Sequence, residues 1–212
     1  MSQSADAPLI FAITGASGAP YAVRLLEQFV ASRTRISLIV SGHGWRLLDT
    51  ESSIADLPAL RAAAGGDAAA WDASVTVFDD DDRGAAPASG SALSRGMVIC
   101  PCSMGTLSAV AMGSSRSLIE RAADVTLKER RKLVLVTRET PLSTIHLGNM
   151  LRVARAGAVV LPAAPGFYNR PREVSDLVDF VVARVLDQLE IPHQLGSRWG
   201  GGARATPDAK GP

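Results

Sequence analysis

The chain has 212 residues, 47% of them hydrophobic, and this length suits one α/β domain with a sizeable core. Its 22 Lys and Arg residues balance 21 Asp and Glu, which argues against a nucleic-acid-binding surface. No apolar run approaches the roughly 20 residues of a membrane span. Residues 1–8 contain no basic region typical of a signal peptide. We therefore expect a cytoplasmic protein that binds neither membrane nor nucleic acid.

Short apolar runs rich in β-branched residues alternate with segments of helical periodicity. The predicted strands cover residues 9–14, 36–41, 75–78, 96–100, 133–137 and 158–161. Helices are predicted from Pro20 onward and over about residues 104–112, 117–130, 141–155 and 174–189. This alternation predicts an α/β fold, a three-layer Rossmann-like (flavodoxin-like) parallel sheet with helices on both faces.

Two stretches have loop composition, residues 79–94 and residues 196–212. We predict a single domain over residues 1–199 and a mobile tail over residues 200–212. The four contiguous acids at 79–82 are not spaced to converge on a magnesium–diphosphate group, and we interpret them as a solvated loop. The two cysteines, Cys100 and Cys102, are too few for a zinc site and are expected to be reduced and buried.

Ligands of parallel sheets bind at the carboxyl ends of the strands. The first predicted strand is followed by Gly15, Ala16, Ser17 and Gly18, which permit close backbone approach to a phosphate at a helix N-terminus. A plain strand–helix turn is the alternative. The Walker and dinucleotide-binding spacings are absent. The second strand ends in Ser41 rather than in an acidic residue for an adenosine ribose, so a mononucleotide is favoured over NAD or FAD.

The fourth and fifth predicted strands also end in polar residues. Ser103, Met104, Gly105 and Thr106 open a helix, either as ligand donors or as an ordinary N-cap. Arg138 and Glu139 directly follow the fifth strand, where side chains face a ligand.

The helix predicted over residues 117–130 places Arg121, Asp124 and Lys128 on one face. This face either binds an anion or is a solvated, salt-bridged surface. The three histidines show no metal-ligand spacing, and no Gly-x-Ser-x-Gly elbow of a serine hydrolase is present. The strand ends and this helix together predict a site for FMN and a second, small phosphorylated molecule, with one carboxylate beside them.

Five motifs carry a resemblance to the UbiX-like flavin prenyltransferases, over about residues 9–199. They are Thr14-Gly-Ala-Ser-Gly-Ala, Cys100-Pro-Cys-Ser-Met-Gly-Thr-Leu, Leu118-Ile-Glu-Arg-Ala-Ala-Asp-Val-Thr-Leu-Lys-Glu-Arg-Arg, Arg138-Glu-Thr-Pro-Leu-Ser-Thr-Ile-His-Leu and Pro162-Ala-Ala-Pro-Gly-Phe-Tyr. The resemblance implies that residues 1–199 form a flavin-binding domain. It implies transfer of a dimethylallyl group from dimethylallyl monophosphate to N5 and C6 of reduced FMN, without a metal. It further implies a UbiD-type decarboxylase as recipient of the prenylated FMN, and a homo-oligomer, usually a dodecamer, with sites shared between subunits.

The resemblance also implies roles for individual residues. The residues expected to bind FMN are Gly15, Ala16, Ser17, Ser41, Ser103, Met104, Gly105, Thr106 and Arg138. Those expected at the dimethylallyl phosphate are Arg121, Lys128, Arg138, Tyr168, Arg184 and Trp199, with Arg121 from a neighbouring subunit. Glu139 is expected to be the main acid/base, assisted by Ser17 and Glu51.

Two alternatives share the flavin loops. One is a flavin-dependent decarboxylase of cysteine-type substrates, and the other is a non-catalytic FMN carrier. The cluster of Arg121, Lys128 and Arg138, together with Tyr168, favours prenyl transfer.

Overall fold

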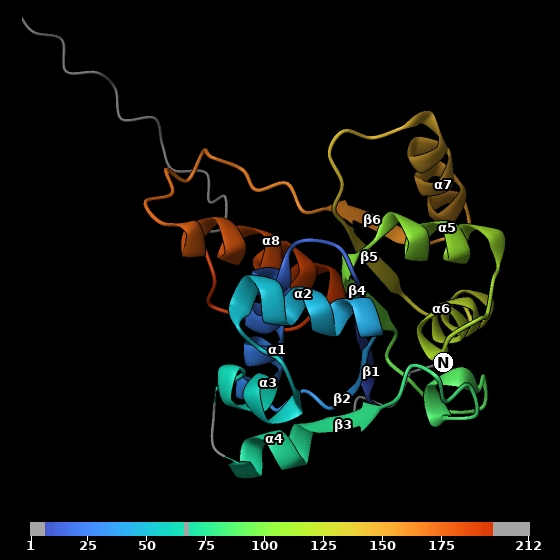
Figure 1. Cartoon of the computed structure of the whole chain (residues 1–212), viewed down its shortest axis with the longest axis horizontal. Helices are drawn as coiled ribbons and strands as arrows, with labels where there is room; N and C mark the ends of the chain where they lie inside the picture. Colours follow the sequence, from blue (N-terminus) through green and yellow to red (C-terminus); the bar gives the residue numbers. More distant parts are fainter. Residues whose placement is uncertain (1–6, 66–67, 197–212) are drawn as a thin grey trace, which may run out of the picture.

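A computed structural model describes residues 7–65 and 68–196. These residues form a six-stranded, wholly parallel sheet with strand order β3-β2-β1-β4-β5-β6 (Figure 1). The strands are β1 Leu9–Ile13, β2 Ile36–Val40, β3 Val75–Phe78, β4 Met97–Cys102, β5 Leu133–Thr137 and β6 Val159–Pro162. All six lie where the sequence predicts them, and the predicted α/β class is confirmed.

The α-helices are α1 Ala19–Ala31, α2 Gly42–Ser52, α3 Leu57–Ala63, α4 Ala68–Ser74, α5 Met104–Met112, α6 Leu118–Lys128, α7 Thr144–Arg155 and α8 Val174–Leu189. A short 3-10 helix, η1, covers Ala86–Ala88. No helix of the described ranges is long and apolar enough to cross a membrane.

The sheet separates two hydrophobic cores because its side chains alternate between its faces. From β1, Phe11 and Ile13 join the core formed with α1 and α8, whereas Ile10 and Ala12 join the core formed with α5 and α6. Every residue of β1, β2, β4 and β5 is buried, as expected for strands covered on both faces. The predicted three-layer arrangement is therefore confirmed.

The sequence prediction missed three helices, α2, α3 and α4, between β2 and β3. The first of them begins Gly-His-Gly-Trp, which has low helix propensity. Tertiary contacts stabilise α2 instead, since Leu48 is fully buried in the core and Trp45 packs against it. The predicted helix over 141–155 begins later, at Thr144, where Ser143 caps it.

Cys100 and Cys102 are free and buried, as predicted. Trp199 and the predicted tail over 200–212 lie outside the described residues. The segment at 79–94 is irregular except for η1 and runs from the end of β3 to the start of β4.

Candidate active site

The candidate site lies at the carboxyl ends of four adjacent strands. The order of the sheet reverses between β1 and β4, which lie side by side although β2 and β3 separate them in sequence. Such a switch point opens a crevice at the carboxyl ends of the strands, where ligands bind. The segments that follow β2, β1, β4 and β5 meet at this edge, in that spatial order. They contain Ser41, Gly15, Ser103 and Arg138.

Thr14 connects the two loops that border the crevice. Its buried hydroxyl donates to the carbonyl of Pro101 at 2.8 Å and accepts from the backbone N–H of Ser103 at 2.9 Å. The Thr14 N–H also bonds the Pro101 carbonyl, at 3.2 Å. These contacts fix the β1 and β4 loops relative to each other before any ligand arrives. The sequence interpretation quoted Thr14 within a motif but gave it no role.

Glu51 occupies the N-terminus of α1. Its Oε2 accepts from the backbone N–H groups of Gly18 and Ala19, both at 2.8 Å. Partial burial raises the pKa of Glu51, but hydrogen bonds from Gly18, the Ser17 side chain and Ala19, together with the positive charge of Arg138, leave the pKa below its ordinary value. An ionised carboxylate therefore fills the anion position that the sequence assigned to phosphate at this helix.

Ser17 and Arg138 both act on the Glu51 carboxylate, Ser17 through a hydrogen bond and Arg138 through its positive charge. The sequence predicts that Ser17 and Glu51 assist Glu139 in acid/base chemistry, and these roles stay predictions. Arg138 donates its backbone N–H to the carbonyl of Cys102 at 3.4 Å, so it remains beside the β4 loop. Glu139 is exposed and accepts from the N–H of Thr140 at 3.0 Å through one carboxylate oxygen.

Ser41 and Ser103 both act as N-caps. The Ser41 side chain accepts from the Gly44 N–H at 3.0 Å, and the Ser103 side chain accepts from the Thr106 N–H at 3.1 Å. The hydroxyls of Ser103 and Thr106 lie 3.0 Å apart. The N-cap interpretation of Ser103 is therefore confirmed. A capping hydroxyl accepts through its oxygen and can still donate its hydrogen, so capping does not exclude ligand binding.

The glycines at this edge leave room for a ligand. A side chain at Gly42 would meet nothing within 4 Å, and one at Gly105 would meet only the Ser103 hydroxyl, at 3.8 Å. By contrast, Gly15 packs directly against His43, so a side chain there would collide. The N-termini of α2 and α5 open beside this space and add positive partial charge. This set of hydroxyls, helix N-termini and Arg138 fits a phosphorylated mononucleotide such as FMN.

Two further residues belong to this region, although the sequence interpretation assigned them no function. Burial raises the pKa of Tyr21, with a further rise from Cys100 and a smaller opposing effect from Arg138. Tyr21 lies beside the β1 loop, since a Cβ atom added to Gly18 would come within 3.0 Å of the Tyr21 ring and 3.5 Å of Pro101. Thr137, the last residue of β5, is 2% exposed, and its hydroxyl has no partner among the described residues. The position of Tyr21 just after Pro20, behind the glycine loop, was the available sequence signal.

Tyr168 and Arg184 share a second region, a cavity of about 610 Å³ between α8 and the loop that follows β6. Tyr168 packs edge-to-face on Phe180 with ring centroids 5.7 Å apart. The Arg184 guanidinium donates to Asp187 at 2.9 Å, and Asp187 also contacts His193 at 3.3 Å. These two predicted phosphate-binding residues therefore line one cavity, and its lining does not include Gly15, Ser41, Ser103 or Arg138.

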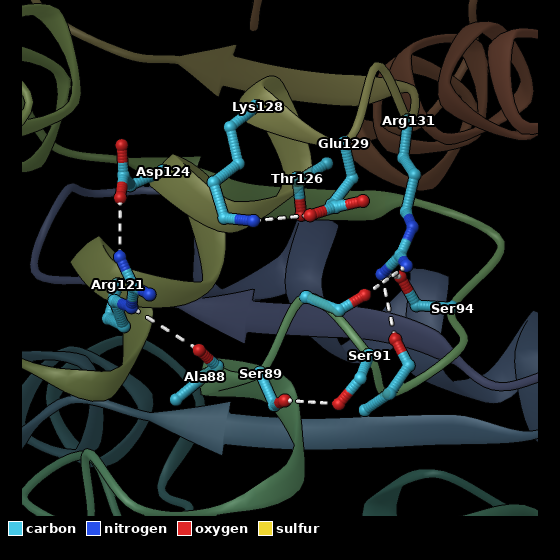
Figure 2. Close-up of polar contacts among 12 residues, drawn as sticks. Ala88, Ser89, Ser91, Ser94, Arg121, Asp124, Thr126, Lys128, Glu129 and Arg131 are labelled. Carbon is cyan, nitrogen blue, oxygen red and sulfur yellow. Dashed lines mark hydrogen bonds and ion pairs between the residues drawn. The ribbon is translucent and has the colours of Figure 1, made fainter.

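Arg121 and Lys128 form a third region, on α6 (Figure 2). Arg121 donates to Asp124 at 2.7 Å and to the carbonyl of Ala88 at 3.3 Å, whereas Lys128 pairs with Glu129. Lys128 ends α6 only five residues before β5 begins, whereas Arg138 follows the last residue of β5. The length of β5, about 15 Å, therefore separates the backbone positions of these two cations at opposite edges of the sheet.

The structure thus distributes the predicted site residues over three regions. The glycine loop, the hydroxyl residues, Glu51, Arg138 and Glu139 lie at the carboxyl edge. Tyr168 and Arg184 line the cavity between α8 and the loop after β6, and Arg121 and Lys128 lie on α6. Trp199 lies outside the described residues. Across residues 7–65 and 68–196, no group of three or more His, Cys, Asp or Glu side chains could hold a metal ion.

Comparisons with known proteins agree with this geometry. The Flavoprotein family model matches residues 2–186. The flavin prenyltransferase UbiX of Pseudomonas aeruginosa is 52% identical over 91% of this chain and 93% of its own. A dodecameric FMN-dependent UbiX-like decarboxylase from Escherichia coli O157:H7 superposes with a TM-score of 0.80 at 40% identity, over 92% of this chain and 100% of that one. AnUbiX (PadA1), in complex with FMN and dimethylallyl pyrophosphate, superposes with a TM-score of 0.77 at 36% identity, over 91% and 99%.

Proposed function

Because this chain belongs to the Flavoprotein family and, within it, to the UbiX flavin prenyltransferases, we propose that it transfers a dimethylallyl group from a dimethylallyl phosphate to FMN. The observation that carries this proposal is the near-full-length similarity to prenyltransferases, combined with a strand-edge site whose donors suit FMN. The AnUbiX complex supports the choice of ligands, since that protein binds both FMN and a dimethylallyl phosphate ester.

When bound in its reduced form, FMN would supply the nucleophilic N5 and C6 positions for the five-carbon group. The protein holds it at the carboxyl edge through the residues predicted for this role, Gly15, Ala16, Ser17, Ser41, Ser103, Met104, Gly105, Thr106 and Arg138. The fixed geometry of the β1 and β4 loops supports this assignment, because Thr14 joins them without help from a ligand. Such preorganisation would hold the ring of a bound FMN close to Arg138 and Glu139, which follow β5 at the same edge of the sheet.

The departing phosphate is the main source of new negative charge in the reaction. Arg138, Lys128 and Arg184 are the cations we propose to stabilise it, with Arg121 assisting and Tyr168 donating a hydrogen bond. Glu139 exchanges the proton that the substitution requires, because its carboxylate is exposed beside Arg138. Ser17 and Glu51 support it at the N-terminus of α1, and Trp199 is proposed to cover the allyl group.

We propose that the complete site forms between copies of the chain in a homo-oligomer, and that this homo-oligomer is a dodecamer. Lys128 lies at the edge of the sheet opposite to Arg138, so another copy has to supply one of the two. Large apolar side chains are exposed on and before α7, as an assembling surface requires, among them Leu142, Ile145, Leu147 and Leu151. The E. coli neighbour is a dodecamer, which supports the same assembly here.

Three further features complete the proposal. No metal is required, because arginine and lysine side chains supply the positive charge and a monophosphate carries less charge than a diphosphate. The prenylated FMN is passed to a UbiD-type decarboxylase, as the family resemblance implies. The protein acts in the cytoplasm, which agrees with its two free thiols, Cys100 and Cys102.

A decarboxylase is the second candidate, because the E. coli neighbour is described as an FMN-dependent decarboxylase. Anaerobic incubation with reduced FMN and dimethylallyl monophosphate, followed by mass spectrometry of the flavin, separates the two candidates. We expect flavin with an added five-carbon unit. Unchanged flavin with both the monophosphate and the diphosphate would contradict prenyl transfer. Carbon dioxide release from a cysteine-type substrate would support the second candidate instead.

A further inference from the structure

The segment between η1 and β4 is fixed to α6 by two arginines (Figure 2). Arg131 donates to the carbonyls of Gly90 and Ala92, both at 2.9 Å, and to the hydroxyl of Ser94 at 3.2 Å. At the other end of the segment, Arg121 donates to the carbonyl of Ala88 at 3.3 Å. Residues 88–94 therefore form a turn whose carbonyls at Ala88, Gly90 and Ala92 face Arg121 and Arg131, which both come later in the chain.

The planar guanidinium of Arg131 is suited to this task. Its fork carries several N–H donors in fixed directions, so one side chain bonds two carbonyls and one hydroxyl at once. Within the turn, the hydroxyls of Ser89 and Ser91 lie 2.9 Å apart and bond each other. The backbone N–H of Arg131 bonds the carbonyl of Thr126 at 2.9 Å, which fixes the main chain of Arg131 to the end of α6.

Gly90 lies directly against the ionised end of Lys128. A Cβ atom added to Gly90 would come within 2.6 Å of Lys128 Nζ and would also collide with Glu129 Oε1. Both of these atoms are the ends of flexible side chains, so the fold tolerates such an atom only if the Lys128–Glu129 pair moves. The backbone of Gly90, held by Arg131, thus limits where the Lys128 ammonium can lie.

We propose that Arg131 is a positioning residue, which holds Gly90 in place and thereby sets the position of the Lys128 ammonium for binding the substrate phosphate. This inference rests on the proposed function, because it assigns Lys128 to the phosphate. Arg131 itself contacts the segment and not the substrate. An unfixed turn would let Lys128 sample several positions, and ordering it would then cost affinity at the moment of binding.

The test measures the Kd of dimethylallyl monophosphate by calorimetry, on the full-length protein loaded with oxidised FMN so that no turnover occurs. Arg131→Ala is expected to weaken binding about tenfold while FMN affinity stays unchanged. Arg131→Lys, which keeps the charge and part of the bonding, is expected to recover part of the loss. Arg130→Ala is the matched control, because Arg130 is an exposed neighbour of the same charge.

A double-mutant cycle shows whether Arg131 acts through Lys128. Lys128→Ala alone is expected to weaken binding at least as much as Arg131→Ala, and the double variant is expected to be no weaker than Lys128→Ala. Fully additive losses, or an unchanged Kd in Arg131→Ala, would overturn the positioning role. An unchanged Kd in Lys128→Ala would also overturn it, while leaving prenyl transfer intact. Failure of the wild-type protein to bind the ester would instead refute the proposed function.

Gly90→Ala provides a second route that keeps every hydrogen bond of Arg131. It is expected to weaken binding of the ester about as much as Arg131→Ala, because the added methyl displaces Lys128. Gly84→Ala is the control, in the loop just before η1, since its added atom would meet only Asp82, at 3.4 Å. Equal Kd values for Gly90→Ala, Gly84→Ala and wild type would overturn the proposal even if Arg131→Ala does not fold.

Discussion

The carboxyl edge of the sheet and the carboxyl end of α6 are built in contrasting ways. At the sheet edge, the chain joins its own loops, since Thr14 links β1 to β4 and Glu51 caps α1. At the end of α6, Arg131 and Arg121 fix a turn beside Lys128, yet the same chain places Arg138 at the other edge of the sheet. In the proposed function, one chain prepares the flavin site and the phosphate-binding surface separately, and assembly of several copies brings the two together.

The largest expected effect comes from Glu139, the proposed acid/base at the carboxyl edge of the sheet. Glu139→Gln keeps the size and hydrogen-bonding capacity of the side chain but cannot exchange a proton. We expect prenyl transfer to slow by about 100- to 10,000-fold. Single-turnover kinetics under anaerobic conditions measures the rate, and FMN affinity, expected to be unchanged, is the control. Wild-type rates in this variant would remove Glu139 from the mechanism.

The second-largest effect is expected at Lys128, at the end of α6. Lys128→Ala should weaken binding of dimethylallyl monophosphate by about 10- to 100-fold, since a hydrogen bond to a charged group contributes about 1.5–3 kcal/mol. FMN binding should change little, because the flavin edge does not depend on Lys128 within one chain. Titration of both ligands measures this difference. An equal loss of affinity for FMN and for the ester would contradict the separation of the two regions.

A smaller effect tests whether the flavin edge is preorganised. Thr14→Val removes the hydroxyl but keeps the shape, leaving the Pro101 carbonyl and the Ser103 N–H each without this partner. We expect the free energy of unfolding to fall by about 1–3 kcal/mol and FMN to bind more weakly. Urea denaturation measures the stability. Thr14→Ser keeps both hydrogen bonds and should resemble wild type; an unaffected Thr14→Val would show that the link is dispensable.

The smallest effect concerns pH and Glu51. Its pKa in the folded protein lies below the ordinary value of 4.5, so its ionised form stabilises the fold above about that pH. This contribution is lost as the pH falls through the lowered pKa. The unfolding midpoint of wild type should therefore drop more between pH 7 and pH 3 than that of Glu51→Gln. Identical pH profiles for the two proteins would contradict the cap at α1.

The strands and several candidate site residues could be predicted from the sequence. Runs of β-branched residues marked every strand, and strand ends marked Arg138 and Glu139, because buried parallel strands leave an unmistakable apolar pattern. Helical spacing placed Arg121 and Lys128 on one face of α6. The predicted order of helix and strand also puts the end of this helix at the edge where β5 begins. The bonds of Arg131 to Gly90 and Ala92 could not be predicted, because they depend on tertiary packing.

The features that the sequence did not reveal depend on contacts between distant segments. α2 starts with two glycines in its first three residues, and only packing of Leu48 into the core explains its helical conformation. Thr14 bonds Pro101, which lies 87 positions away in the chain, and Glu51 bonds Gly18, which lies 33 positions away. Arg131 bonds Gly90 across 41 positions. No local pattern encodes such partners, so propensity and periodicity alone could not identify them.

The account depends on a site that combines Glu139 of one copy with Lys128 of another, and mixed oligomers test this directly. Glu139→Gln and Lys128→Ala are co-expressed with different tags, and oligomers carrying both tags are purified. If the site is shared, about one quarter of the sites in a random mixture contain both native residues, and prenyl transfer should recover to about that fraction of wild type. Activity no higher than the mean of the two single variants would show that one chain supplies both residues, and would contradict the account.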